Sequence, residues 1–91
     1  MNEYYLLTFE STHAAIQTEK LLKPAGIQIM PVPRFISASC GISIRIKPES
    51  REQAEEIFRA DSPLGKDEYH YYHVVIDPAT KEVDCSPLET L

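Results

Sequence analysis

The sequence predicts a single α+β domain of the ferredoxin-like type, in which two helices cover one face of a four-stranded antiparallel sheet. Its 91 residues suit one domain, and no linker, repeat or low-complexity segment divides residues 1–91. The spacing of apolar residues alternates between the two-residue period of a strand and the 3.6-residue period of a helix. The resulting order is strand, helix, strand, strand, helix, strand. Residues 41–47 alternate isoleucine with polar residues, which is typical of an antiparallel strand with one buried face.

The first part of the chain, up to residue 32, is expected to form a strand, a helix and a second strand. Residues 4–9 are rich in aromatic and β-forming residues, which predicts a first strand buried on both faces. Ser11 and Thr12 can cap a helix, whose apolar face would be formed by Ala14, Thr18, Leu21, Leu22 and Ala25. Pro24 disfavours helical geometry before it, so the regular helix should end a turn before Gly26. Residues 27–32 then predict a second strand.

The rest of the chain repeats this order after the strand over residues 41–47. Ser50 and Gln53 have the spacing of a capping box. The second helix that follows has an inner stripe of Ala54, Ile57 and Phe58. Residues 69–76 are aromatic and β-branched, which predicts the fourth strand. The sequence leaves open a further edge strand over residues 83–85.

Composition excludes several classes of partner. The net charge is −5 and the nine basic residues are scattered, which argues against nucleic acid as the partner. No apolar run is long enough to span a membrane, and the first residues lack the features of a signal peptide. We therefore expect a cytoplasmic protein with no membrane association.

The segment of residues 33–41, between the second and third strands, is the candidate site. It is longer than a usual hairpin loop and places Cys40 among small polar residues. A nearby cation and hydrogen-bond donors favour a thiolate, and the residues able to act on Cys40 in this way are Arg34, Ser37, Ser39 and Gly41. Gly41 would allow a positive φ and a close approach of the backbone. The spacing alone leaves equally open a buried, inert Cys40.

The other reactive side chains carry weaker hypotheses. Two cysteines are too few for a disulfide scaffold, and Cys85 follows an acidic residue that should raise its pKa. His13 is expected to be an exposed residue of the first helical turn. His70 and His73 should lie on opposite faces of a strand, so they cannot share a metal. With no C-x-x-C pair and no recognisable triad, we expect neither a metal site nor a cofactor.

The residues of the candidate segment also carry a family resemblance. The stretch from Thr8 to Gly41 resembles the selenium/sulfur carrier protein-like family of small bacterial domains, and the likeness covers nearly the whole chain. The residues that carry it are Ser11, Thr12, His13, Glu19, Lys20, Leu21, Leu22, Gly26, Ile27, Pro33, Arg34, Ile36, Ser37, Ser39, Cys40 and Gly41. Pro24 departs from the more regular helix end expected of the family.

The resemblance implies a carrier rather than a catalyst. Cys40 would hold sulfur or selenium as a persulfide or selenenyl sulfide and exchange it with donor and acceptor proteins. On this hypothesis Cys40 should be exposed. The alternative is a non-enzymatic regulatory or protein-interaction module of the same fold. In an interaction module the tyrosine-rich residues 69–72 could form the surface that binds a partner, although their packing in the core or in a homodimer is the favoured interpretation. Neither donor nor acceptor follows from the sequence.

Overall fold

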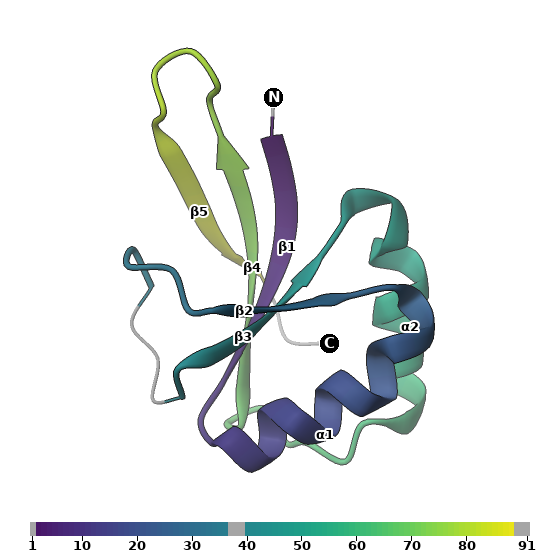
Figure 1. Ribbon diagram of the computed structural model, residues 1–91. Coiled ribbons are helices and arrows are strands. Elements are labelled where there is room, and N and C mark those ends of the chain that lie inside the picture. The colour runs from purple at the N-terminus through teal and green to yellow at the C-terminus, as the bar shows by residue number, and fades with distance from the viewer. Residues whose placement is uncertain (1, 37–39, 89–91) are drawn as a thin grey trace.

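The computed structural model describes residues 2–36 and 40–88 (Figure 1). In chain order the elements are β1 (Asn2–Phe9), α1 (Thr12–Leu22), the 3-10 turn η1 (Lys23–Ala25), β2 (Gln28–Pro31), β3 (Ile42–Ile46), the 3-10 turn η2 (Pro48–Ser50), α2 (Arg51–Asp61), β4 (Tyr69–Ile76) and β5 (Val83–Leu88). The first four strands and both helices lie within two residues of the predicted ranges.

The strands form one antiparallel sheet in the order β2-β3-β1-β4-β5. On the central strand, Leu7 lies opposite Ile44 on one side and Tyr71 on the other. The α+β class with two helices and an antiparallel sheet is therefore confirmed. The assignment of this domain to the ferredoxin-like fold remains a prediction.

The predicted number of strands is wrong, because the described part of the chain has five rather than four. After a turn in which the Asp77 side chain accepts the Ala79 N–H at 2.8 Å, β5 pairs with β4 from Ile76–Val83 to Tyr71–Leu88. An edge strand needs a partner on only one side, so it tolerates polar residues and proline. Its sequence consequently shows little of the alternation that identifies inner strands.

The two faces of the sheet carry different cores. On one face Tyr5, Leu7 and Phe9 of β1 pack against both helices, including Phe58 of α2. Figure 1 shows α1 and α2 together on this side. On the other face Tyr4, Leu6 and Val74 pack with Ile36, which comes from the chain after β2. Since β1 buries side chains on both faces, the prediction made for it is confirmed.

The two helices begin differently. Ser11 caps α1 as predicted, because its Oγ accepts the Ala14 N–H at 3.1 Å. The predicted capping box of α2 is wrong, since Ser50 makes no side-chain cap hydrogen bond. The turn η2 gives Ser50 near-helical dihedral angles, whereas a capping serine has an extended backbone.

Helix α1 ends as the sequence predicts. Its regular part stops at Leu22, the turn η1 follows, and Gly26 closes the segment with φ of 75°. The Gly26 N–H bonds to the carbonyl of Lys23 at 3.1 Å. A left-handed residue in this position is the common way to finish a helix, and glycine adopts it without steric cost.

Candidate functional site

Cys40 lies where three elements meet. It comes two residues before β3, and its N–H donates to the carbonyl of Phe9 at the end of β1 at 3.3 Å. Its side chain belongs to the core on the helix-covered face, and only 4% of the residue is exposed. The expectation of an exposed thiol is therefore wrong, because the backbone bond to β1 turns the residue toward the start of α1.

The sulfur of Cys40 has two polar neighbours. The Ile42 N–H donates to Sγ at 3.3 Å, and the Thr12 hydroxyl lies 3.7 Å from Sγ. Thr12 is the first residue of α1, where the peptide dipoles of a helix present their positive end. A backbone N–H, a hydroxyl and a helix start are all groups that stabilise negative charge on sulfur.

Among the residues that were expected to act on the Cys40 thiol, those that the structure describes form no hydrogen bond with its sulfur. Arg34 is exposed and makes no hydrogen bond or ion pair with the described residues. Gly41 does not use a positive φ, and a Cβ added there would meet no atom within 4 Å. Ser37 and Ser39 lie outside the described residues. The donors that reach the sulfur are instead those of Thr12 and Ile42.

Sequence reasoning missed these two donors for a physical reason. In the sequence Thr12 indicates only a helix cap, and it is separated from Cys40 by 28 positions. Ile42 acts through its main chain, which leaves no trace in the residue type. The available signal was the pairing of two features, a helix start after the first strand and a cysteine before the third, which antiparallel packing can bring together.

Cys85 lies apart from Cys40. It is half-buried on β5 and packs with the core on the face opposite the helices, whereas Cys40 packs with the helix-covered face. Burial raises the pKa of the Cys85 thiol, and the neighbouring Asp84 raises it further, as the sequence predicts. These properties do not suit Cys85 to act as a partner thiol for Cys40.

The histidines hold separate positions. His70 lies 3.6 Å from Glu10, while His73 stacks on the Tyr5 ring with centroids 4.7 Å apart and bonds to Glu3 at 2.6 Å. They lie on opposite faces of β4, which confirms the prediction.

Residues 2–36 and 40–88 contain no group of three His, Cys, Asp or Glu arranged to hold a metal ion. No helix described there is long and apolar enough to cross a membrane.

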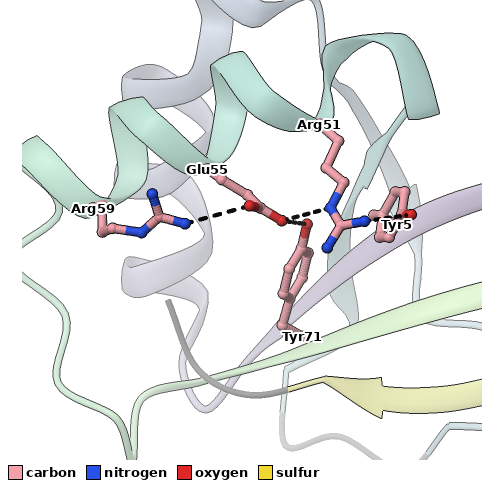
Figure 2. Close-up of polar contacts among 5 residues, drawn as sticks. All are labelled: Tyr5, Arg51, Glu55, Arg59 and Tyr71. Atoms are coloured by element: carbon pink, nitrogen blue, oxygen red, sulfur yellow. Dashed lines mark hydrogen bonds and ion pairs between the residues drawn. The ribbon is translucent and has the colours of Figure 1, made fainter.

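A polar cluster between α2 and the sheet was also missed by sequence reasoning (Figure 2). Glu55 Oε2 accepts hydrogen bonds from Arg51 Nε and from the Tyr71 hydroxyl, both at 2.8 Å. Arg59 lies 3.4 Å from the other carboxylate oxygen. Arg51 also donates to the Tyr5 hydroxyl at 2.9 Å, with its guanidinium 4.5 Å from the centre of that ring. The cluster ties α2 to β1 and β4.

The acid–base properties of the cluster follow from this geometry. Burial by itself would raise the pKa of the Glu55 carboxyl, but the hydrogen bonds from Arg51 and Tyr71 outweigh it and hold the pKa below its usual value. Burial and donation to Glu55 together raise the pKa of Tyr71 well above its usual value. The carboxylate therefore stays charged and the phenol neutral, as the hydrogen bonds require. The spacing of Arg51, Glu55 and Arg59 by four residues could have revealed the helical part of this cluster.

Fold and thiol together define a small α+β domain with one buried cysteine whose sulfur faces the start of a helix. Residues 4–67 match the protein family described as "Putative Se/S carrier protein-like". The match covers well over half of the chain and includes Thr12, Cys40 and Ile42, so the chain belongs to this family. No curated protein and no solved structure shows a significant match.

Proposed function

We propose that this protein is a carrier that holds sulfur or selenium on Cys40 and passes it between a donor and an acceptor protein. Membership of the family supports the class of function, and Cys40 lies inside the matched residues, whereas Cys85 lies outside them. The single observation that carries the choice of residue is the hydrogen bond from the Ile42 N–H to Cys40 Sγ, made beside the first residue of α1. The same donors suit an anionic persulfide, whose charge they would partly offset.

The proposed loading step moves one neutral sulfur atom. The Cys40 thiolate attacks the outer sulfur of a persulfide on the donor, and a new S–S bond forms as the S–S bond of the donor breaks. The donor leaves as a thiolate and takes up the proton that Cys40 released, so no net oxidation or reduction occurs. Unloading is the same exchange with a thiol of the acceptor as the attacking group. A selenium atom in the outer position follows the same balance.

Burial sets a requirement on this step. Because only 4% of Cys40 is exposed, a donor reaches Sγ only after the side chains around it shift. The same burial favours the second candidate function, a regulatory or protein-interaction module in which Cys40 serves only to pack the core. The two candidates differ in whether the thiol reacts in the folded protein.

Intact-mass spectrometry after incubation with glutathione persulfide tests the proposal. We expect the wild type to gain the mass of one sulfur atom, which a reductant removes. Cys85→Ser is the matched control and should gain the same mass, whereas Cys40→Ser should gain none. Circular dichroism melting of each variant, before and after incubation, shows whether the domain remains folded. A parallel incubation with a selenium analogue of the donor decides between the two elements.

Two results would contradict the carrier. One is a folded wild type that stays unmodified although small alkylating agents reach Cys40. The other is a Cys40→Ser variant that gains as much sulfur as the wild type. Specific binding of a partner protein that persists in Cys40→Ser would then support the interaction module.

A further inference from the structure

The outer edge of β5 is a row of main-chain groups that have no partner among the described residues. In the strand order β2-β3-β1-β4-β5 this strand lies at one end of the sheet, and Figure 1 shows it at the margin of the molecule. The Asp77 N–H donates to the Glu82 carbonyl at 2.9 Å, which makes these two residues a hydrogen-bonded pair. Such pairs alternate along an antiparallel ladder, so the main-chain groups of Val83, Cys85 and Pro87 point away from β4.

The opposite edge of the sheet is less open to a further strand. It is formed by β2, which has four residues, whereas β5 has six. The Val32 N–H donates to the Gly41 carbonyl, so by the same alternation Ile29 and Pro31 point outward from β2. Pro31 has no N–H to donate, which leaves Ile29 as the outward donor of this strand. Because β5 is longer and has two outward donors, it is the better template for a further strand.

The outward residues of β5 also carry an apolar row on the face opposite the helices. Cys85 lies beside Val74 and packs in the core of that face, and Val83 lies beside Ile76 in the same row. Val83 is nevertheless 42% exposed, which makes it one of few large apolar residues so exposed among those described. A strand added to the outer side of β5 would both cover Val83 and satisfy the main-chain groups of the edge.

The residues of β5 are complementary to a second copy of the same strand. In an antiparallel pair with its two-fold axis at Cys85, the two Cys85 residues lie opposite each other and Val83 lies opposite Pro87 of the second copy. Each Cys85 N–H then donates to the Cys85 carbonyl of the other copy, and each Val83 N–H donates to the Pro87 carbonyl. Apolar side chains meet apolar ones on one face, while Asp84 lies opposite Ser86 on the other.

Charge and proline disfavour the two neighbouring registers of this pair. With the axis at Asp84 as many hydrogen bonds form, but the two Asp84 carboxylates lie directly opposite each other, which is destabilising. With the axis at Ser86, Cys85 lies opposite Pro87, whose missing N–H removes half of the hydrogen bonds. The register centred on Cys85 carries neither penalty, so the sequence of β5 favours one symmetric arrangement.

We propose that this protein forms a homodimer in which two β5 strands pair antiparallel about Cys85 and join the two sheets into one. A contact of one strand with another is small, so the dimer is weak and forms at high protein concentration. The Cβ atoms of a hydrogen-bonded pair lie about 5.5 Å apart, too far for a disulfide, so Cys85 stays a free thiol. Cys40 lies on the other face of the sheet, so the dimer does not depend on the proposed carrier function and should persist in Cys40→Ser.

Sedimentation equilibrium and amide hydrogen exchange of the full chain test the dimer. We expect a monomer at micromolar concentration and a growing fraction of dimer toward millimolar concentration. Over the same range the amides of Val83 and Cys85 should become protected from exchange, whereas the outward amide of Ile29 on the other edge should not. Val83→Pro removes an outward donor and should weaken the dimer by about tenfold or more, because two hydrogen bonds are lost by symmetry. Ile29→Pro is the matched control and should dimerise like the wild type.

A charge exchange tests the register. Ser86→Asp places a carboxylate opposite Asp84 of the second copy and should weaken the dimer by about two- to tenfold, since the pair occurs twice. Adding Asp84→Lys turns the repulsion into attraction and should restore the dimer, which it would not do with the axis at Asp84.

Circular dichroism melting shows whether each variant stays folded, and the exchange measurement needs no substitution. Four results would each overturn the proposal. They are a wild type that stays monomeric at millimolar concentration, a dimer in which the Val83 and Cys85 amides exchange as in the monomer, a folded Val83→Pro that dimerises like the wild type, and a charge exchange that does not restore the dimer.

Discussion

Gly26 and Gly41 show how differently two glycines can serve one chain. Gly26 has φ of 75° and closes the segment after α1, so its backbone needs the freedom that a Cβ removes. Gly41 follows Cys40 but has neither a positive φ nor a close neighbour at its Cβ position. Proximity to the candidate thiol therefore says nothing about why Gly41 is a glycine, whereas the dihedral angle of Gly26 explains that residue fully.

Alanine substitution separates the two glycines. Gly26→Ala should lower the free energy of unfolding by about 1–2 kcal/mol, the usual cost of a left-handed conformation for an L-residue. Gly41→Ala is the matched control and should change it by less than about 0.5 kcal/mol. Urea denaturation measures both. Equal losses in the two variants would contradict the assignment of strain to Gly26 alone.

Helix α2 is held to the sheet by polar contacts as well as by Phe58. Its Glu55 side chain is only 15% exposed and receives three donors, two from its own helix and one from Tyr71 of β4. Arg51 continues the contact to Tyr5 of β1. This half-buried carboxylate is stable in its position because its hydrogen bonds compensate for lost hydration, so the charge of Glu55 contributes to holding the helix on the sheet.

The pH dependence of stability should report this carboxylate. The pKa of Glu55 is lower in the folded than in the unfolded protein, so the unfolded state takes up the proton first on acidification. The stabilisation is complete above the ordinary glutamate pKa of 4.5 and is lost as the pH falls through the lower folded value. Urea unfolding at stepwise lower pH should show a steeper loss for the wild type than for Glu55→Gln.

The exposed Glu56 on the same helix provides the control for this measurement. Glu56→Gln removes a carboxylate that makes no hydrogen bond or ion pair with the described residues. Its unfolding should follow the wild-type pH dependence. If Glu55→Gln and the wild type lose stability in parallel below pH 4.5, the assigned role of Glu55 is wrong.

The whole molecule is organised around a sheet with two unequal faces. Helices cover one face, while the other is covered within the described residues by Ile36 and by side chains of the sheet itself, such as Met30 and Tyr72. This arrangement separates the two thiols, since Cys40 belongs to the first core and Cys85 to the second. Each cysteine therefore behaves according to its own surroundings.

Oxidation tests the separation of the thiols. Treatment of the folded protein with diamide should produce no intramolecular disulfide, because the sheet lies between the two side chains. Intact-mass and non-reducing electrophoretic analysis should show a monomer that retains both thiols. The urea-unfolded chain is the control and should form the bond, since there the sheet no longer separates them. A Cys40–Cys85 disulfide formed in the native protein would contradict the placement of the two residues.

The order and approximate limits of the first four strands and both helices follow from local information in the sequence. Their apolar periods, the cap at Ser11 and the glycine at position 26 depend on neighbours within a few residues, and local backbone physics acts over the same range. The small polar residues around Cys40 and the family resemblance both indicate its segment as the candidate site. Neither shows whether the thiol is buried.

The remaining features arise from contacts between residues far apart in the chain. The fifth strand forms because β4 offers a free edge, and Thr12 meets the sulfur of Cys40 because β1 and β3 are neighbours in the sheet. Arg51 reaches Tyr5 across 46 positions for the same reason. Such contacts depend on which strands pair and which face the helices cover. Only the folded structure decides this, because pairing energy is shared by the whole sheet and is not encoded in any one segment.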